Sequence, residues 1–450
     1  FNLDQEKLDR EISHFPKIIF SAYSTTTLKM AGGLMQLVAY GAQDVYLTGN
    51  PEVTFFQAKY KRHTNFAMEN IEQTVNGTAA DSGRVSVTVA RNGDLVGDMY
   101  VELKSKSGIA SITSDATADL CWVAERAISS VEMSIGGQRV DKHYQRWWRL
   151  YSELYLDECK KATWGKMTTG TADSTVYLPL IFFFNRNPGL YLPLIALQYH
   201  EVRIDFDLSS EFTTYLNTDT FKVWANYIYL DTEERRRFAQ KGHEYLIEQV
   251  QHTGTDTVTS ASTKQVRLSY NHPVKELVWC FDEGVARTKM WNFTSKGAVG
   301  EVVLEADPTG IADSNAFIST STSGAPLLKL GTGGTAAANA FTEEVVGPLN
   351  TFKLVLNGQD RFKEQKGKYF NQVQPHFHHS GSPYAGVYSY SFALKPEEHQ
   401  PTGTCNFSRI DNAQVSVTMN TTDATNMHMF ATNYNVLRIQ SGMGGLAFSN

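Results

Sequence analysis

Residues 131–138 read Val-Glu-Met-Ser-Ile-Gly-Gly-Gln, and residues 352–359 read Phe-Lys-Leu-Val-Leu-Asn-Gly-Gln. In the first stretch, strand-like residues flank Gly136-Gly137, which predicts a β-hairpin because glycine accepts the positive φ of a tight turn. The second stretch is an imperfect copy of the first. A motif that returns after so many residues indicates a duplicated domain rather than a solenoid of small units.

Other motifs recur in the same order around this pair. Residues 71–73 and 247–249 are both Ile-Glu-Gln, and each precedes an alternating strand. Residues 176–177 and 387–388 are both Val-Tyr, and each opens a segment that closes on such a strand. The four alternating strands are residues 84–90, 265–270, 202–208 and 415–419. The repeat therefore predicts two similar β domains in tandem, and it favours an architectural protein over an enzyme.

The bulk composition agrees with this interpretation. A chain of 450 residues is too long for one ordinary core and suits two or three domains. The net charge of −6 argues against a broad basic surface for nucleic acid, since phosphate contacts need clustered Lys and Arg. Four scattered cysteines form no C-x-x-C pair, which argues against a zinc knuckle. The longest apolar runs fall short of the ~20 residues that span a bilayer.

These patterns predict an all-β fold of two tandem eight-stranded antiparallel jelly-roll β-sandwiches with short helical insertions. Aromatic residues at intervals of three and four over residues 144–155 predict one amphipathic helix whose aromatic face is packed in the core. Asn92-Gly93 predicts a hairpin between strands at 84–90 and 99–103.

We expect the chain to divide into six parts. They are an N-terminal extension (1–29), an N-terminal arm (30–50), the first jelly-roll domain (51–231), a linker (232–243), the second jelly-roll domain (244–437) with a long surface loop (295–341), and a C-terminal segment (438–450). The loop is rich in Gly, Ala, Ser and Thr and can bury little apolar surface. Gly442-Met443-Gly444-Gly445 lacks the Lys-Ser/Thr pair of a phosphate-binding loop, so we expect a flexible terminus there.

Few motifs suggest chemistry. His376 and His378 would share one face of a strand, as metal-binding pairs do in jelly-roll enzymes, but a Ser-Gly-Ser-Pro turn follows in place of a further ligand. An exposed polar loop is the simpler interpretation. Asp205 and Asp207 share the outward face of a strand, where solvated charges are commoner than a carboxylate pair. We therefore expect no catalytic residue, no cofactor and no enzymatic activity.

Four N-x-S/T triplets are candidate glycosylation sites, although such triplets arise often by chance. They begin at Asn76, Asn292, Asn406 and Asn420.

Several ordered blocks resemble the major capsid protein of nucleocytoplasmic large DNA viruses, and the likeness is greatest to the phycodnavirus (chlorovirus-like) members. The longest block is residues 30–51, Met-Ala-Gly-Gly-Leu-Met-Gln-Leu-Val-Ala-Tyr-Gly-Ala-Gln-Asp-Val-Tyr-Leu-Thr-Gly-Asn-Pro. The other blocks are residues 55–56 with 62–66, 135–139, 179–188 with 192–202, 357–362, 403–412 and 434–446. The resemblance covers residues 30–450 and leaves residues 1–29 outside.

The resemblance implies a double jelly roll that forms homotrimers, and pseudo-hexagonal capsomers that tile the icosahedral shell of a large double-stranded DNA virus. It implies a virion protein assembled in the host cytoplasm. Its expected partners are further copies of itself, neighbouring capsomers and minor capsid proteins. The inner side would lie near a viral membrane, glycans could decorate outer loops, and no direct nucleic-acid binding is expected. Because residues 30–50 and 438–450 are Gly-rich, we expect them on the inner side or across subunits.

Two other functions suit a jelly roll. A carbohydrate-binding protein would need aromatic residues in a groove, for which Trp147, Trp148 and Trp164 are available, although a helical aromatic stripe is normally core. A cupin-like metal protein would need an ion near His376 and His378. Bound sugar or bound metal in the purified protein would distinguish these functions from a stable trimer.

Overall fold

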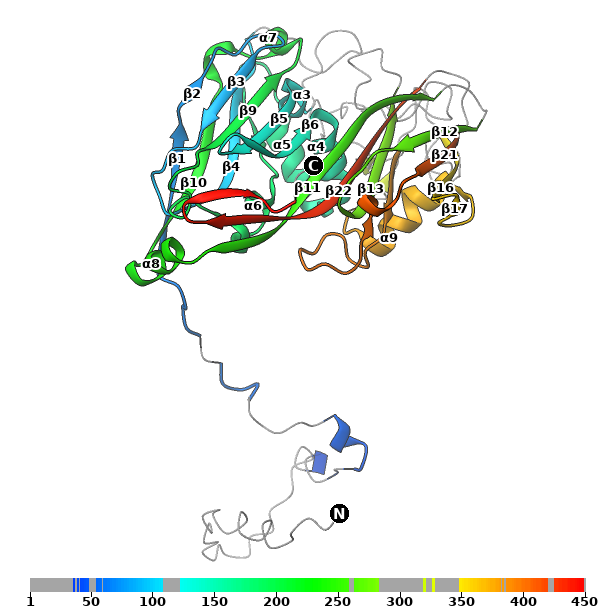
Figure 1. The fold of residues 1–450 in the computed structure, drawn as a ribbon, viewed down its shortest axis with the longest axis horizontal. Helices are drawn as coiled ribbons and strands as arrows, with labels where there is room; N and C mark the ends of the chain where they lie inside the picture. Colours follow the sequence, from blue (N-terminus) through cyan, green and yellow to red (C-terminus); the bar gives the residue numbers. More distant parts are fainter. Residues whose placement is uncertain are drawn as a thin grey trace, which may run out of the picture. The chain divides into compact units, whose positions relative to one another are not determined.

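The computed structural model separates the chain into two compact units, residues 1–63 and residues 64–450. The residues that it describes are 35–36, 39, 41–47, 54–58, 60–107, 122–258, 263–282, 319–320, 326–327, 348–381, 383, 386–419 and 425–448. In the first unit it describes a short 3-10 helix, η2 (Asp44–Tyr46). The two jelly rolls both lie in the second unit (Figure 1).

The first jelly roll has two antiparallel sheets around an apolar core. One sheet has the order β1-β10-β4-β7, with β8 paired to β4, and the other has the order β2-β3-β9-β5-β6. The strands of the first sheet are β1 (Phe66–Gln73), β4 (Leu95–Lys104), β7 (Thr175–Pro179), β8 (Leu192–Pro193) and β10 (Lys222–Leu230). Those of the second are β2 (Val75–Asn76), β3 (Arg84–Thr88), β5 (Ile128–Ile135), β6 (Gln138–Tyr144) and β9 (Val202–Leu208).

The second jelly roll repeats this arrangement. Its sheets have the orders β11-β22-β13-β19 and β12-β21-β16-β17. The first sheet contains β11 (His243–Val258), β13 (Pro273–Asp282), β19 (Val387–Ser391) and β22 (Thr425–Gln440), with β20 (Cys405–Asn406) and β23 (Met443–Leu446) at its sides. The second contains β12 (Lys264–Leu268), β16 (Leu349–Leu356), β17 (Gln359–Asp360), β18 (Gln365–Lys366) and β21 (Ala413–Met419).

The strand orders of the two jelly rolls match, apart from the additional short strand β2 at one edge, which confirms the predicted duplication and the double jelly-roll fold. The Ile-Glu-Gln motifs lie in β1 and β11, and both strands occupy the edge of the corresponding sheet. The Val-Tyr motifs lie in β7 and β19 at the opposite edge. The turns after β5 and β16 both use positive φ, at Gly136-Gly137 and at Asn357-Gly358. Residues predicted to correspond therefore occupy corresponding places.

Alternating side chains build the core of each jelly roll. In β21, Ala413, Val415, Val417 and Met419 point inward and are buried, while the residues between them are half-buried. One apolar cluster fills the first jelly roll and continues into Ile247, Phe430 and Leu437 of the second. A separate cluster around Trp279 fills the remainder of the second jelly roll.

Short helices lie in the connections between strands. They are α3 (Val123–Ala127), α4 (Gln145–Leu154), α5 (Glu158–Thr168), α6 (Phe183–Arg186), α7 (Phe212–Tyr215), α8 (Thr232–Gln240) and α9 (Gln374–His378), with single turns η3 (Pro188–Leu190), η4 (Thr218–Thr220), η8 (Tyr369–Val373) and η9 (Phe407–Arg409). Helix α4 confirms the predicted aromatic stripe, since Trp147 and Trp148 are buried. Within the described residues, no helix is both long and apolar enough to cross a membrane.

The predicted hairpin at Asn92-Gly93 is wrong. Strand β3 pairs with β9, whereas β4 pairs with β10 and β7, so the two strands that flank this turn belong to different sheets. The turn carries the chain from one sheet to the other. A Cβ added at Gly93 would lie 2.9 Å from the Cβ of Tyr227, so glycine is needed here for close packing rather than for a two-residue hairpin.

Parts of the predicted division lie outside the described residues. These parts include all of residues 1–29 and most of the loop 295–341, of which β14 (Ser319–Thr320) and β15 (Pro326–Leu327) are described. The expected linker 232–243 contains helix α8, whose Asp231 cap accepts a hydrogen bond from the Thr232 N–H. Arg235 of this helix donates two hydrogen bonds to Asp94, at 2.9 and 3.0 Å.

Candidate functional site

The candidate metal pair is not assembled. Residues 374–378 form helix α9 rather than a strand, so the expectation that His376 and His378 share a strand face is wrong. The His376 side chain is exposed, and the Nδ1 atom of His378 lies 3.0 Å from the carbonyl oxygen of Leu394. Across the described part of the chain, no three His, Cys, Asp or Glu side chains are grouped as metal ligands would be.

The two strand aspartates belong to a surface ion-pair network. Arg84 reaches both carboxylates at 3.5 Å, and it joins Asp205 to Asp207. Ser86 donates a hydrogen bond of 2.6 Å to Asp205, which is 8% exposed. Burial opposes ionisation of Asp205, but the hydrogen bonds from Ser86 and Arg203 outweigh burial and lower the pKa of its carboxyl group. Arg84 therefore pairs both carboxylates with one cation.

The tryptophans proposed for sugar binding are core residues. Trp147, Trp148 and Trp164 are 3%, 0% and 6% exposed. The Trp164 indole N–H donates a hydrogen bond of 2.5 Å to the buried Glu125. An aromatic ring that stacks on a sugar must present its face to solvent, so these three rings are not available for that role.

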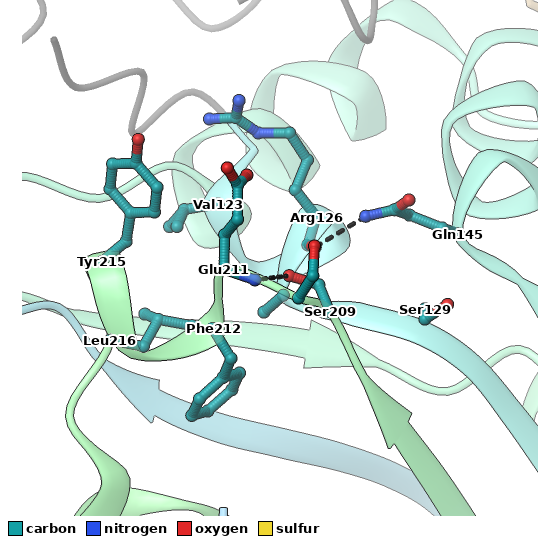
Figure 2. Close-up of a pocket in the computed structure, with 11 residues that line it drawn as sticks. Val123, Arg126, Ser129, Gln145, Ser209, Glu211, Phe212, Tyr215 and Leu216 are labelled. Carbon is teal, nitrogen blue, oxygen red and sulfur yellow. Dashed lines mark hydrogen bonds between the residues drawn. The ribbon is translucent and has the colours of Figure 1, made fainter. Parts of the chain in front are cut away.

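A small pocket lies between the end of β9 and the start of helix α4 (Figure 2). Its volume is about 140 Å³, and its wall includes Arg126, Gln145, Glu211 and Tyr215. Gln145 donates a hydrogen bond of 2.6 Å to the backbone oxygen of Arg126. Its lining contains serines and Glu211 but neither histidine nor cysteine, so it lacks the histidine that activates a serine in the common hydrolase triads.

The largest polar cluster that we identify lies instead at the seam, where the two jelly rolls meet. Figure 1 shows β11 and β22 running together out of the second jelly roll toward the first. Glu248 of β11 is 5% exposed and accepts a hydrogen bond of 2.9 Å from Arg186 of the first jelly roll. Lys275 of β13 lies 2.6 Å from the other carboxylate oxygen of Glu248. Burial raises the pKa of Glu248, but the two cations outweigh this effect and lower it.

A second group of the seam surrounds His379. Its ring nitrogens face Glu276 and Glu397, and the hydroxyl of Tyr155, at the end of α4, donates a hydrogen bond to the same Glu276. The next turn also crosses the seam, because the Gly381 N–H donates to the backbone oxygen of Leu154 at 3.1 Å. Burial would lower the pKa of His379, but the two carboxylates raise it to about 9. His379 is therefore a cation at neutral pH.

Backbone groups close the seam further along β11. The Val250 N–H donates a hydrogen bond of 3.0 Å to Asp141 of β6, and the Gln249 side chain donates to the backbone oxygen of Val140. Gln249 is itself held by Asn433 and Asn435, whose side chains donate to its oxygen at 3.3 and 3.1 Å. The bonds to Asp141 and Val140 cross the interface, while the asparagines hold Gln249 in place from within the second jelly roll.

The C-terminal glycines form a clasp, defined here as residues 441–446. Residues 443–446 are strand β23, so the expectation of a flexible terminus is wrong for them. The Tyr199 N–H donates to the backbone oxygen of Gly442 at 3.0 Å, and the Gly444 N–H lies 3.2 Å from His200 Nδ1. A Cβ at Gly442 would lie 2.6 Å from the Tyr199 ring. Glycine thus lets this hairpin approach the first jelly roll of its own chain.

Two of the four glycosylation candidates are described. Asn76 lies in β2 and Asn406 in β20, and both residues are exposed. The Asn406 side chain accepts a hydrogen bond of 3.0 Å from the Ser408 N–H. Asn292 and Asn420 lie outside the described residues.

Sequence reasoning missed the seam as a functional feature. Its members come from β6, α4, α6, β11, β13 and the loop after α9, and no local motif unites them. The one available signal is the repeated Ile-Glu-Gln motif. Glu72 of the first copy has a side chain that is 46% exposed and lies 3.7 Å from Lys222, whereas Glu248 of the second is buried.

Comparison with known proteins assigns both halves of the chain. A family model for the N-terminus of the major capsid protein matches residues 54–231, and a model for the large eukaryotic DNA virus major capsid protein matches residues 234–445. The major capsid protein of Paramecium bursaria Chlorella virus 1 is 44% identical over 94% of this chain and 100% of that protein. The major capsid protein of Phaeocystis pouchetii virus is 39% identical over the same shares.

Structural comparison agrees. A chain of the quasi-atomic model of the PBCV-1 virus capsid superimposes with a TM-score of 0.71 and 39% sequence identity, covering 88% of this chain and 100% of that one. Two like jelly rolls, joined by a buried seam and matched end to end by these relatives, place the chain among the major capsid proteins of large eukaryotic DNA viruses, which build the virion shell and are not enzymes.

Proposed function

We propose that three copies of the chain form a homotrimeric, pseudo-hexagonal capsomer, and that such capsomers tile the icosahedral shell of a large double-stranded DNA virus. The observation that carries this proposal is the correspondence of the two jelly rolls. Three chains with two like domains each provide six similar corners, and a closed ring needs only one type of rotation between chains.

The seam supports a capsomer of fixed shape. It joins the two jelly rolls through a shared apolar cluster, through the ion pair between Arg186 and Glu248, and through the hydrogen bond from the Tyr155 hydroxyl to Glu276. A chain whose two domains were free to rotate could not present six corners in one plane. Breaking a buried, hydrogen-bonded ion pair is costly, so the seam favours one relative orientation.

Native mass spectrometry of the purified chain tests the proposal. The expected result is a complex of three chains, stable on dilution, because lasting interfaces of this kind bury ~2,000 Å² or more. A monomer or a dimer at the same concentration would contradict it.

We propose in addition that residues 30–50 and the C-terminal segment 438–450 face the inner side of the shell or a neighbouring chain. The support from residues 30–50 is their exposed apolar side chains: Met35, Val45 and Leu47 are 59%, 58% and 85% exposed. Burying such side chains on a neighbour would stabilise the assembly by about 2 kcal/mol each. Limited proteolysis tests this, since cleavage of the arm should slow when chains are assembled; equal rates in dissociated and assembled chains would refute it.

Further partners follow from the same proposal. The inner side would contact minor capsid proteins and lie near the viral membrane, and assembly would take place in the host cytoplasm. Glycans would occupy outer loops, with Asn76, Asn292, Asn406 and Asn420 as candidates. Intact-mass measurement before and after glycosidase treatment of virion protein tests the glycans, and mapped glycopeptides would identify the positions.

A further inference from the structure

The seam within the chain has two complementary sides. On the first jelly roll, the end of α4 and helix α6 provide Tyr155, Phe183 and Arg186. On the second jelly roll, the edge strand β11 provides Glu248. These residues share a cavity of about 420 Å³, which shows that α4, α6 and β11 converge. Because the chain is duplicated, each side has a counterpart elsewhere in the same chain.

The counterpart of the first side lies on the second jelly roll. Helix α9 precedes β19 as helices α4 and α5 precede β7, and Leu394 follows Val387 at the distance at which Phe183 follows Val176. These counterparts carry apolar side chains that the chain leaves uncovered. Phe377 and Leu394 are each 72% exposed, and Val373 is 39% exposed. The bond from His378 to the Leu394 oxygen places them together, and we call them the α9 patch.

The counterpart of the second side is strand β1, which corresponds to β11. It pairs with β10 alone in its sheet, and residues 66–70 are exposed on both faces of the strand. Phe66 and Met68 are 48% and 53% exposed. An edge strand with large apolar side chains exposed on both faces promotes aggregation of the free chain. We therefore expect a neighbouring chain to bury β1 in the assembly.

We propose that β1 of one copy packs against the α9 patch of a neighbouring copy, as β11 packs against the α4–α6 side within the chain. This inference rests on the homotrimer proposed above. In a ring of six similar domains, contacts within chains alternate with contacts between chains, and both contacts use corresponding surfaces. The exposed side chains of β1 and of the α9 patch would then be buried in the same interface, and the partner is a second copy of this chain.

The two surfaces are complementary in chemistry. Phe66 and Met68 supply apolar side chains opposite Phe377 and Leu394, which suits the dry centre of an interface. The β1 counterpart of Glu248 is Glu72, and the exposed Lys395 follows Leu394; within one chain their side chains pair with Lys222 and Glu398. A pairing of Glu72 with the neighbour's Lys395 would exchange these solvated partners, but it would not repeat the place of Arg186, because Glu397 stands ten residues after Val387 where Arg186 stands ten after Val176.

Site-specific photo-crosslinking of the assembled full-length chain tests the interface. Met68→p-benzoylphenylalanine is prepared in unlabelled chain and mixed during assembly with ¹⁵N-labelled wild-type chain. Irradiation is expected to join position 68 to residues 369–395 of a labelled chain, as mapped by peptide mass spectrometry. The matched control is Gln265→p-benzoylphenylalanine, at an exposed position on β12, which should give no product with residues 369–395.

A second variant gives an independent measurement. Phe377→Glu places a charge in the α9 patch and is expected to raise the concentration at which trimers dissociate about tenfold or more, because interface anchors contribute about 2 kcal/mol. The melting curve of the dissociated chain should stay unchanged, since Phe377 is exposed within one chain.

The outcomes separate this inference from the proposed function. Trimers whose crosslinks from position 68 fall outside residues 369–395, or within one chain, would overturn the interface and leave the homotrimer intact. Unchanged dissociation of the Phe377→Glu trimer would also overturn the interface. Absence of any trimer in the wild-type chain would overturn the proposed function itself.

Discussion

Glu72 and Glu248 occupy equivalent positions in the two copies of one motif, yet their surroundings are opposite. The Glu72 carboxylate lies 3.7 Å from Lys222 in a solvated pair, whereas Glu248 is buried between Arg186 and Lys275. A solvated pair contributes ~0–1 kcal/mol, while removing one member of a buried pair leaves an uncompensated charge. The contribution of each glutamate to stability therefore depends on whether the packing of the two jelly rolls buries it.

Glu248→Gln should lower the free energy of unfolding by about 3–5 kcal/mol, because Arg186 and Lys275 would lose their shared carboxylate. Glu72→Gln is the matched control from the first repeat, with an expected change of at most about 0.5 kcal/mol. Urea denaturation at one fixed protein concentration measures both changes. Equal effects of the two substitutions would show that burial at the seam does not make Glu248 contribute more to stability than Glu72.

His379 should make the seam sensitive to alkali. Its pKa of about 9 in the folded chain lies above the ordinary value of 6.5, since Glu276 and Glu397 favour the protonated ring. The stabilisation is therefore complete below about pH 6.5 and is lost as pH rises through 9, with a total of roughly 3 kcal/mol. The free energy of unfolding, followed from pH 6 to pH 10, should fall in this window. His379→Gln should remove that fall, and an unchanged slope would contradict the assignment.

At the scale of elements, two glycine turns show how the same signal serves different structures. Gly136-Gly137 joins β5 to β6 as a hairpin, whereas Asn92-Gly93 carries the chain between sheets. In both turns, glycine avoids a steric clash that a side chain would cause. At Gly93 the close neighbour is Tyr227 of β10, a strand of the other sheet, so this turn leads into a different sheet instead of forming a hairpin.

Gly136→Ala should destabilise the chain more than Gly137→Ala does. Both positions have positive φ, at 58° and 85°, so both substitutions incur strain of about 1 kcal/mol. A Cβ at Gly136 would also lie 2.4 Å from the His200 ring, which contacts Gly444 of the clasp, whereas a Cβ at Gly137 meets nothing within 4 Å. Overpacking should add about 1–3 kcal/mol at Gly136. Thermal denaturation of the two variants measures the difference, and equal melting temperatures would refute it.

The sequence predicted those elements whose information is local or repeated. The alternation in β9, the stripe of α4 and the paired motifs in β1 and β11 each follow from residues close in the chain. The seam could not be predicted in this way. Its bond from Arg186 to Glu248 joins residues 62 positions apart, and the clasp contact joins His200 to Gly444 across 244 positions. Such pairs depend on how two finished domains meet.

At the scale of the whole molecule, the two jelly rolls share one continuous core. The apolar cluster of the first jelly roll includes Ile247, Phe430 and Leu437 from the second. The long strands β11 and β22 place these residues against the first jelly roll, and β23 holds their far end. The second jelly roll therefore cannot leave without exposing part of the first core.

The two jelly rolls should consequently unfold together. Differential scanning calorimetry of dissociated chains should give a single transition, with a calorimetric enthalpy close to the van't Hoff enthalpy. Glu248→Gln is expected to shift this transition as a whole rather than split it. Two resolved transitions in the wild-type chain would mean that the seam does not couple the domains.

The clasp has a consequence for the order of events in building the shell. Since β23 seals the joint between jelly rolls inside one polypeptide, half of the edges in the proposed tile are complete as soon as each chain has folded. Two encounters between chains then assemble a ring that six separate domains would need five encounters to assemble. The interfaces between chains can also differ in sequence from the interface inside each chain, which β23 closes. The ring then alternates two kinds of interface and has threefold rather than sixfold symmetry.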